Sequence, residues 1–183
     1  KLYEELSTET QIVMEWIHGV SLNKCSSTEL EVIIPILLNA VYDMVFVHHL
    51  VHGDIHEGNI LVTKNKQVAF LDWGLLHILS EEDVILLQVF FQKDLDLLAQ
   101  ICYKWGTGKV APIYFQTALK QIFTENKDNF CNLLQALVKL FEIDQVHMKE
   151  SLLKPLLAFV SVEGIAQKYS SYSIIDVVQQ RAL

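Results

Sequence analysis

The stretch His52-Gly-Asp-Ile-His-Glu-Gly-Asn59 decides the fold, together with Asp72-Trp-Gly74 downstream of it. Polar residues and glycines dominate the first segment, which predicts a loop. Between the two segments lie the short apolar runs 60–62 and 68–71, separated by a polar turn. This pattern predicts a β-hairpin. The aspartate of the second segment therefore stands at the end of the second hairpin strand.

These two segments carry the residue types that phosphoryl transfer requires. Its transition state spreads negative charge over phosphate oxygens, so catalysis needs divalent metal ions on hard oxygen ligands and a carboxylate for the attacking hydroxyl. The order Asp-x-x-x-x-Asn and then Asp-aromatic-Gly has the spacing of the protein-kinase catalytic loop and its metal-binding motif. We therefore predict Asp54 as the catalytic base and Asn59 and Asp72 as magnesium ligands, with ATP and Mg²⁺ as cofactors.

Neighbouring residues receive supporting roles in this hypothesis. His52 is expected to brace the loop from beneath, and Gly58 and Gly74 to support its backbone. His56 stands where kinases usually carry a lysine, so we predict that it contacts the transferring phosphate. The plainer explanation treats the aspartates and the asparagine as turn formers or strand-end residues. Their joint occurrence in this order favours the catalytic interpretation.

The segment from about residue 11 to residue 19 is predicted as the hinge of a kinase-like domain. Residues 11–16 are apolar and β-prone, which predicts a strand. Its backbone groups are expected to face adenine, with Met14, Glu15 and Ile17 as the nucleotide-binding residues. In this interpretation residues 1–183 form a C-terminal lobe, and the N-lobe is absent from the sequence. We expect such a lobe to hold metals weakly and to catalyse nothing on its own.

The rest of the chain has mainly helical periodicity. Apolar residues recur at helical spacing between residues 28 and 50, where Pro35 is expected to separate a short helix from a longer one. A capping-box pattern at residues 80–83 predicts a helix that runs to about Trp105. Further helices are expected over residues 111–123, 128–141, 149–169 and 174–181. One small hairpin among helices predicts an α+β fold in a single domain: a mainly helical, protein-kinase-like C-lobe whose hairpin carries the metal site.

Composition excludes some partners. The chain has 14 basic and 22 acidic residues, a net charge of −8. A nucleic-acid partner is therefore not expected, because phosphate backbones require a basic face.

The longest apolar stretch, residues 32–47, contains a proline, an asparagine and an aspartate, and it is shorter than the roughly 20 residues that span a bilayer. We expect no transmembrane segment in this chain.

These motifs resemble those of the UbiB / aarF-domain-containing (ADCK) family of atypical kinases. The loop 52–59 is similar to that family's His-x-Asp-Pro-His-Pro-Gly-Asn loop, and residues 6–19 resemble its hinge region. Residues 80–106, 163–164 and 172–177 resemble its later helices. The resemblance implies an atypical kinase or ATPase that uses Mg-ATP in ubiquinone or isoprenoid-lipid metabolism. It also implies association with a bacterial or mitochondrial membrane, with a lipid or lipid-pathway proteins as partners.

The loop departs from that family at identifiable positions. Ile55 and Glu57 replace the two prolines, and Asp72-Trp-Gly74 replaces Asp-Phe-Gly. Gly53 and Trp73 also fit the loop of the aminoglycoside/choline phosphotransferases, so a small-molecule phosphotransferase is one alternative. A pseudokinase that acts as an interaction module is another. The flanking segments favour the UbiB type.

Overall fold

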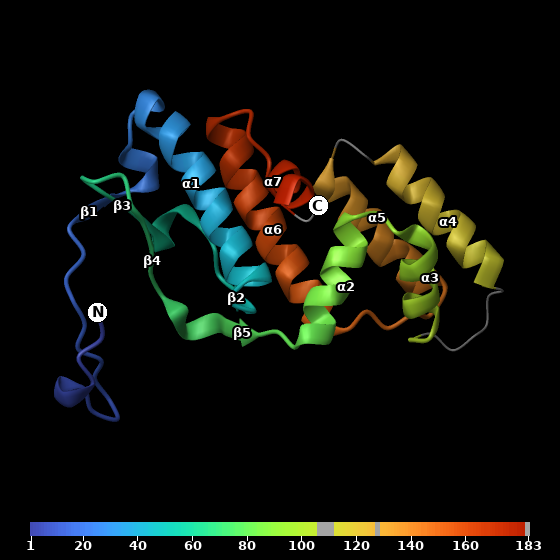
Figure 1. The fold of residues 1–183 in the computed structure, drawn as a ribbon, viewed down its shortest axis with the longest axis horizontal. Helices are drawn as coiled ribbons and strands as arrows, with labels where there is room; N and C mark the ends of the chain where they lie inside the picture. Colours follow the sequence, from blue (N-terminus) through green and yellow to red (C-terminus); the bar gives the residue numbers. More distant parts are fainter. Residues whose placement is uncertain (106–111, 127–128, 182–183) are drawn as a thin grey trace.

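The computed structural model describes residues 1–105, 112–126 and 129–181. Figure 1 shows an elongated molecule with β1, β3, β4 and the N-terminus at one end and α3, α4 and α5 at the other. The elements in chain order are β1 (Gly19–Ser21), α1 (Ser27–Phe46), β2 (Leu50–His52), β3 (Ile60–Thr63), β4 (Val68–Phe70), β5 (Leu76–Ile78), α2 (Glu81–Phe91), α3 (Leu95–Tyr103), α4 (Pro112–Glu125), α5 (Phe130–Ile143), α6 (Glu150–Tyr169) and α7 (Ile174–Arg181).

Helix α1 is one continuous helix that precedes β2 and the loop 52–59. It begins at a capping box, in which Ser26 and Glu29 exchange side-chain and backbone hydrogen bonds. The predicted division at Pro35 is wrong, because Pro35 lies inside the helix. A proline in a helix interior costs about 3 kcal/mol. Burial of the apolar side chains on both sides of Pro35 offsets this cost.

Two small sheets carry the loop segments. The predicted hairpin is confirmed: β3 and β4 pair antiparallel, with Ile60 opposite Phe70. Strand β1 adds to the other edge of β3, and β2 pairs antiparallel with β5.

The strand predicted at residues 11–16 is wrong, because within the described residues this segment makes only an isolated bridge between Met14 and Leu2. A β-prone sequence forms a strand only where a partner strand is available. Here β3 pairs with residues 19–21 instead of with residues 11–16.

The helix predicted from Ser80 to Trp105 is two helices. The capping box at Ser80 and Asp83 begins α2 as expected, but α2 ends at Phe91. Lys93 then adopts a positive φ of 59°, and the side chain of Asp94 accepts a hydrogen bond from the Leu97 N–H, which caps α3. Helices α4 to α7 lie close to their predicted ranges, although the predicted starts at residues 111 and 128 fall outside the described residues.

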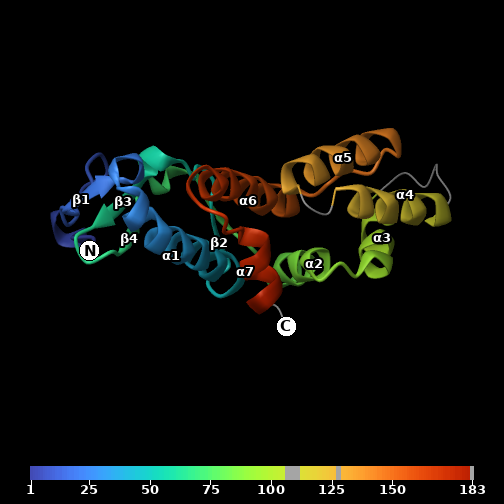
Figure 2. The same cartoon turned by 90° about the horizontal axis from the view of Figure 1, so that it is seen from above.

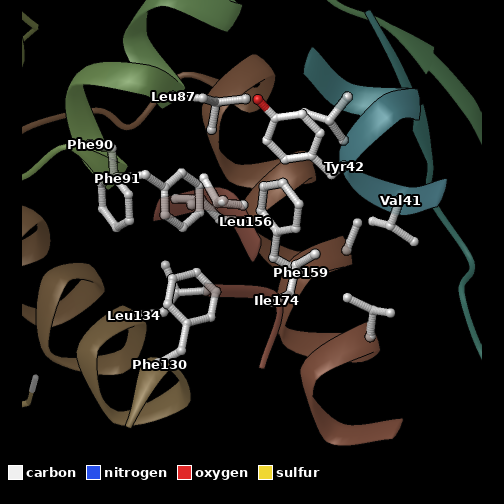
Figure 3. Close-up of a cluster of buried hydrophobic side chains, with 14 of the residues drawn as sticks. Val41, Tyr42, Leu87, Phe90, Phe91, Phe130, Leu134, Leu156, Phe159 and Ile174 are labelled. Carbon is white, nitrogen blue, oxygen red and sulfur yellow. The ribbon is translucent and has the colours of Figure 1, made fainter. Parts of the chain in front are cut away.

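Aromatic side chains from several helices form the centre of the core. Figure 3 shows Tyr42 of α1, Phe91 of α2, Phe130 of α5 and Phe159 of α6 converging on one cluster. The rings of Phe91 and Phe159 lie 5.2 Å apart, and those of Phe91 and Phe130 lie 5.9 Å apart. Such contacts add to the gain from burying apolar area. The core therefore fixes α1 and α6 relative to each other.

Helix α7 packs against α1, as Figure 2 shows from above. Arg181 at its end forms an ion pair of 2.8 Å with Asp43 and lies over the ring of Tyr42. None of the helices in the described parts of the chain is both long enough and apolar enough to cross a membrane.

Candidate active site

His52 connects the two predicted motifs. Its side chain is buried at 1% exposure, at the end of β2. Its Nδ1 accepts a hydrogen bond of 3.2 Å from the Asp54 N–H, so Nε2 carries the proton and donates to the Leu71 carbonyl at 2.8 Å. The imidazole therefore joins the start of the catalytic loop to the residue before Asp72. This is the bracing position that the sequence predicts for His52.

The loop places two predicted site residues, Asn59 and His56, beside the carboxylate of a third, Asp54. The amide nitrogen of Asn59 donates to the backbone carbonyl of Asp54 at 3.1 Å and lies 3.4 Å from its Oδ2. The Nε2 of His56 lies 3.6 Å from the same carboxylate oxygen. About half of the Asp54 side chain is exposed, so the carboxylate remains accessible to a substrate. The other ring nitrogen of His56, Nδ1, accepts a hydrogen bond from the Gly58 N–H at 3.0 Å.

Asp72 lies directly beside this loop. The Leu71 N–H donates a hydrogen bond of 2.8 Å to the Asn59 carbonyl, which continues the β3–β4 pairing by one step. Asp72 itself has a left-handed backbone (φ 56°, ψ 70°), which is uncommon for a residue other than glycine. Its Oδ1 accepts a weak hydrogen bond of 3.4 Å from the Gly74 N–H. The carboxylate is therefore oriented by the turn that follows it.

The described residues fit a magnesium ion at this point. Among them, no donor reaches the amide oxygen of Asn59 or the second carboxylate oxygen of Asp72. Magnesium commonly takes one or two protein oxygens, with phosphates and water completing its octahedron. In the same parts of the chain, no group of three or more His, Cys, Asp or Glu residues could hold a metal. The donor set thus fits a nucleotide-bound magnesium ion better than a dedicated all-protein metal site.

The predicted hinge segment lies beside the hairpin strand β3. Met14, Glu15 and Ile17 line a hollow of about 720 Å³. Residues 61–64, in and just after β3, also line it, as does Leu71. Leu71 directly precedes Asp72, so one lining residue of the hollow is the sequence neighbour of a predicted metal ligand. All predicted nucleotide-binding residues therefore line one surface.

Gly53 has a structural role that sequence analysis did not detect. Its N–H donates to the Leu75 carbonyl at 2.7 Å, and a Cβ on Gly53 would lie only 2.7 Å from that same oxygen. This close approach explains why the residue between His52 and Asp54 is a glycine. Trp73 also contributes: its ring lies 5.0 Å from that of His52, and its Nε1 donates to the Phe70 carbonyl. The aromatic residue after Asp72 thus packs on the bracing histidine.

Comparison with known proteins identifies the family. The model of the ABC1 atypical kinase-like domain matches residues 1–100, which is more than half of the chain, and the chain therefore belongs to this family. An AarF domain-containing protein kinase 1 from Mus musculus is 31% identical over 128 residues, covering 62% of this chain and 24% of that protein. A probable protein kinase UbiB from Shewanella woodyi is 31% identical over 136 residues, covering 66% and 25%. These relatives confirm the resemblance to the UbiB and aarF-domain proteins.

A solved structure confirms the fold. The complex of Rv3197 with erythromycin from Mycobacterium tuberculosis superposes with a TM-score of 0.58 at 18% sequence identity, covering 94% of this chain and 49% of that one. The chain therefore has a kinase-like fold of α+β type. It spans about a quarter of the length of the curated relatives that it matches.

Proposed function

We propose that this chain forms the magnesium-nucleotide half of the active site of a UbiB-type ATP-dependent phosphotransferase or ATPase. The observation that carries the proposal is the backbone hydrogen bond between Asn59 and Leu71, which brings Asn59 and Asp72 together. Their free oxygens would hold magnesium, which neutralises charge on the nucleotide phosphates. Met14, Glu15 and Ile17 would receive the base in the hollow that they line together with Leu71.

In this function Asp54 orients the attacking hydroxyl or water and accepts its proton. Its carboxylate is accessible, and Asn59 fixes it from one side. His56 lies against the same carboxylate and is positioned to contact the transferring phosphoryl group. His52 would keep the loop attached to Leu71, the residue before Asp72. This division of roles is the general one of positioning and charge stabilisation in phosphoryl transfer.

The test is magnesium-dependent nucleotide binding by the full-length protein, followed by turnover of ATP. We expect Mg-ADP to bind and Mg-ATP to be hydrolysed or to transfer its phosphoryl group. Mutation should separate the loss of turnover from the loss of Mg-ADP binding. Absence of Mg-ADP binding at millimolar concentration would instead favour a pseudokinase that acts as an interaction module.

A small-molecule phosphotransferase is the second candidate. Gly53 and Trp73, which fit the aminoglycoside/choline phosphotransferase loop, both have close packing roles in this site. The two candidates differ in the acceptor. Phosphate release from Mg-ATP without added acceptor supports the UbiB-type ATPase, whereas turnover that depends on an added amino sugar or amino alcohol supports the second candidate.

A role in ubiquinone or isoprenoid-lipid metabolism, at a mitochondrial or bacterial membrane, is part of the same proposal. It is supported by relatives that are named as probable protein kinases UbiB. Co-sedimentation of the full-length protein with lipid vesicles tests the membrane association, and loss of quinone in cells that lack the protein tests the pathway.

A further inference from the structure

Lys168, near the end of α6, contacts the catalytic loop from outside. Its Nζ lies 2.8 Å from Oε1 of Glu57, although the two residues are 111 positions apart in the sequence. The Glu57 side chain is 22% exposed and therefore largely enclosed. The ammonium also lies over the ring of Tyr169, 4.9 Å from its centroid. The carboxylate of Glu57 thus has a cationic partner that is itself held in place.

Glu57 occupies a central position in the loop. It begins the 3₁₀ turn Glu57–Asn59, directly after His56. Its backbone carbonyl accepts a hydrogen bond of 3.2 Å from the Ser21 hydroxyl. Two other parts of the chain therefore hold Glu57 in place: Ser21 contacts its backbone and Lys168 its side chain. Glu57 itself lies between His56 and the predicted metal ligand Asn59 in the sequence.

We infer that Lys168 is a positioning residue, which acts through Glu57 to keep Asp54 and Asn59 in their relative places during phosphoryl transfer. The inference rests on the proposed function. The loop contains exposed Gly58, and glycine leaves a backbone freer than other residues do. Misplacement of reacting groups by about 1 Å can lower a rate on the order of 10²-fold. An external contact that restricts the loop therefore has a direct effect on turnover.

The local backbone provides a second way to restrict the loop, which makes the inference testable. His56 has an extended backbone (φ −147°, ψ 164°), the conformation that a residue before proline favours. In the described residues the Glu57 N–H donates no hydrogen bond, and Glu57 is the first residue of its turn. Proline is tolerated at such a position, and it is the residue that the resembling family loop carries there. Glu57→Pro is thus expected to restrict the loop without an ion pair.

The experiment measures ATP turnover and Mg-ADP affinity in the full-length protein for four proteins: wild type, Lys168→Met, Glu57→Pro and the double variant. Methionine keeps an unbranched apolar stem and removes the charge. We expect Lys168→Met, with Glu57 in place, to lower kcat by about fivefold or more. The Kd for Mg-ADP should change by a smaller factor than kcat, because Asp72 still holds the magnesium ion whereas catalysis also depends on the position of Asp54. In the Glu57→Pro background, Lys168→Met should have no effect on kcat.

Lys154→Met is the matched control. Lys154 is on the same helix and forms an exposed ion pair with Glu150, 3.1 Å apart, away from the loop. Its substitution removes the same charge from α6 and should leave kcat unchanged. A charge exchange, Glu57→Lys with Lys168→Glu, should recover most of the wild-type kcat.

Two outcomes would overturn the inference. One is a kcat for Lys168→Met equal to that of Lys154→Met, and the other is an equal loss in the Glu57 and Glu57→Pro backgrounds. Failure of the proposed function looks different, because wild type would then show no Mg-ADP binding. Normal Mg-ADP binding with no effect at Lys168 refutes only the positioning role.

Discussion

The N–H of Leu71 donates a hydrogen bond of 2.8 Å to the carbonyl of Asn59, one step beyond the last strand pair of the β3–β4 hairpin. This single contact places the end of the catalytic loop next to the residue before Asp72. Two motifs that are separated in the sequence thereby become one site. His52 makes a second connection, since its Nε2 donates to the carbonyl of the same Leu71.

The first prediction separates catalysis from binding. Asp54→Asn keeps the size of the side chain but removes its basicity, and it should reduce ATP turnover by on the order of 10²–10⁴-fold. The affinity for Mg-ADP should remain close to that of wild type, because Asp54 is not among the predicted metal ligands. Steady-state kinetics and calorimetric titration with Mg-ADP measure the two effects. A parallel loss of affinity and turnover would contradict the assignment of Asp54 as the base.

The second prediction concerns Gly53. A Cβ at this position would approach the Leu75 carbonyl oxygen to 2.7 Å, so the loop must shift in Gly53→Ala. We expect destabilisation of about 1–3 kcal/mol by chemical denaturation. Gly164→Ala in α6 is the control, because nothing lies within 4 Å of its added Cβ, and it should stabilise by about 0.5–1 kcal/mol. Equal effects of the two substitutions would show that the contact with Leu75 is not as close as described.

The third prediction concerns the thiols. Burial raises the pKa of Cys102 to about 12, whereas Cys131 is exposed. Because the thiolate is the reactive form, iodoacetamide at pH 8 should modify Cys131 in the folded protein and reach Cys102 only after unfolding. Mass spectrometry of digested protein measures this order. Modification of Cys102 at a rate similar to that of Cys131 in the native protein would contradict its burial.

The fourth prediction is a pH dependence of the ion pair between Glu57 and Lys168. The pKa of Glu57 is lowered from its ordinary value of 4.5, so its contribution to stability is present above that value and is lost as pH falls through the lowered pKa. The pKa of Lys168 is raised from 10.5, so its contribution is lost as pH rises through the raised pKa. The difference in Tm between wild type and Lys168→Met should therefore be constant across neutral pH and disappear in acid. A difference that persists at about pH 2 would exclude the ion pair as its cause.

The sequence was sufficient for those features whose causes are local. The loop 52–59, the hairpin and the capping box at Ser80 follow from residue type and spacing over a few positions. The sequence also predicted that the two motifs share one site, because a hairpin between them brings its ends together.

Features that depend on distant contacts could not be predicted in this way. Pro35 remains inside a helix because the packed side chains around it outweigh its local cost. Residues 11–16 are β-prone but do not form a strand, since pairing depends on a partner. The pair of Glu57 and Lys168 joins positions that only the folding of α6 against the loop brings together. The same is true of the contact between Gly53 and Leu75.

The central claim is that Asn59 and Asp72 hold a magnesium-nucleotide complex, and a thermal shift with Mg-ADP on full-length wild type and Asp72→Asn tests it most directly. A ligand at 100 times its Kd stabilises by about 2.7 kcal/mol, which corresponds to a rise in Tm of several degrees. The account predicts this rise in wild type, its loss when magnesium is chelated, and its loss in Asp72→Asn. A wild-type protein with no shift at millimolar Mg-ADP, or an Asp72→Asn variant with the full shift, would contradict it.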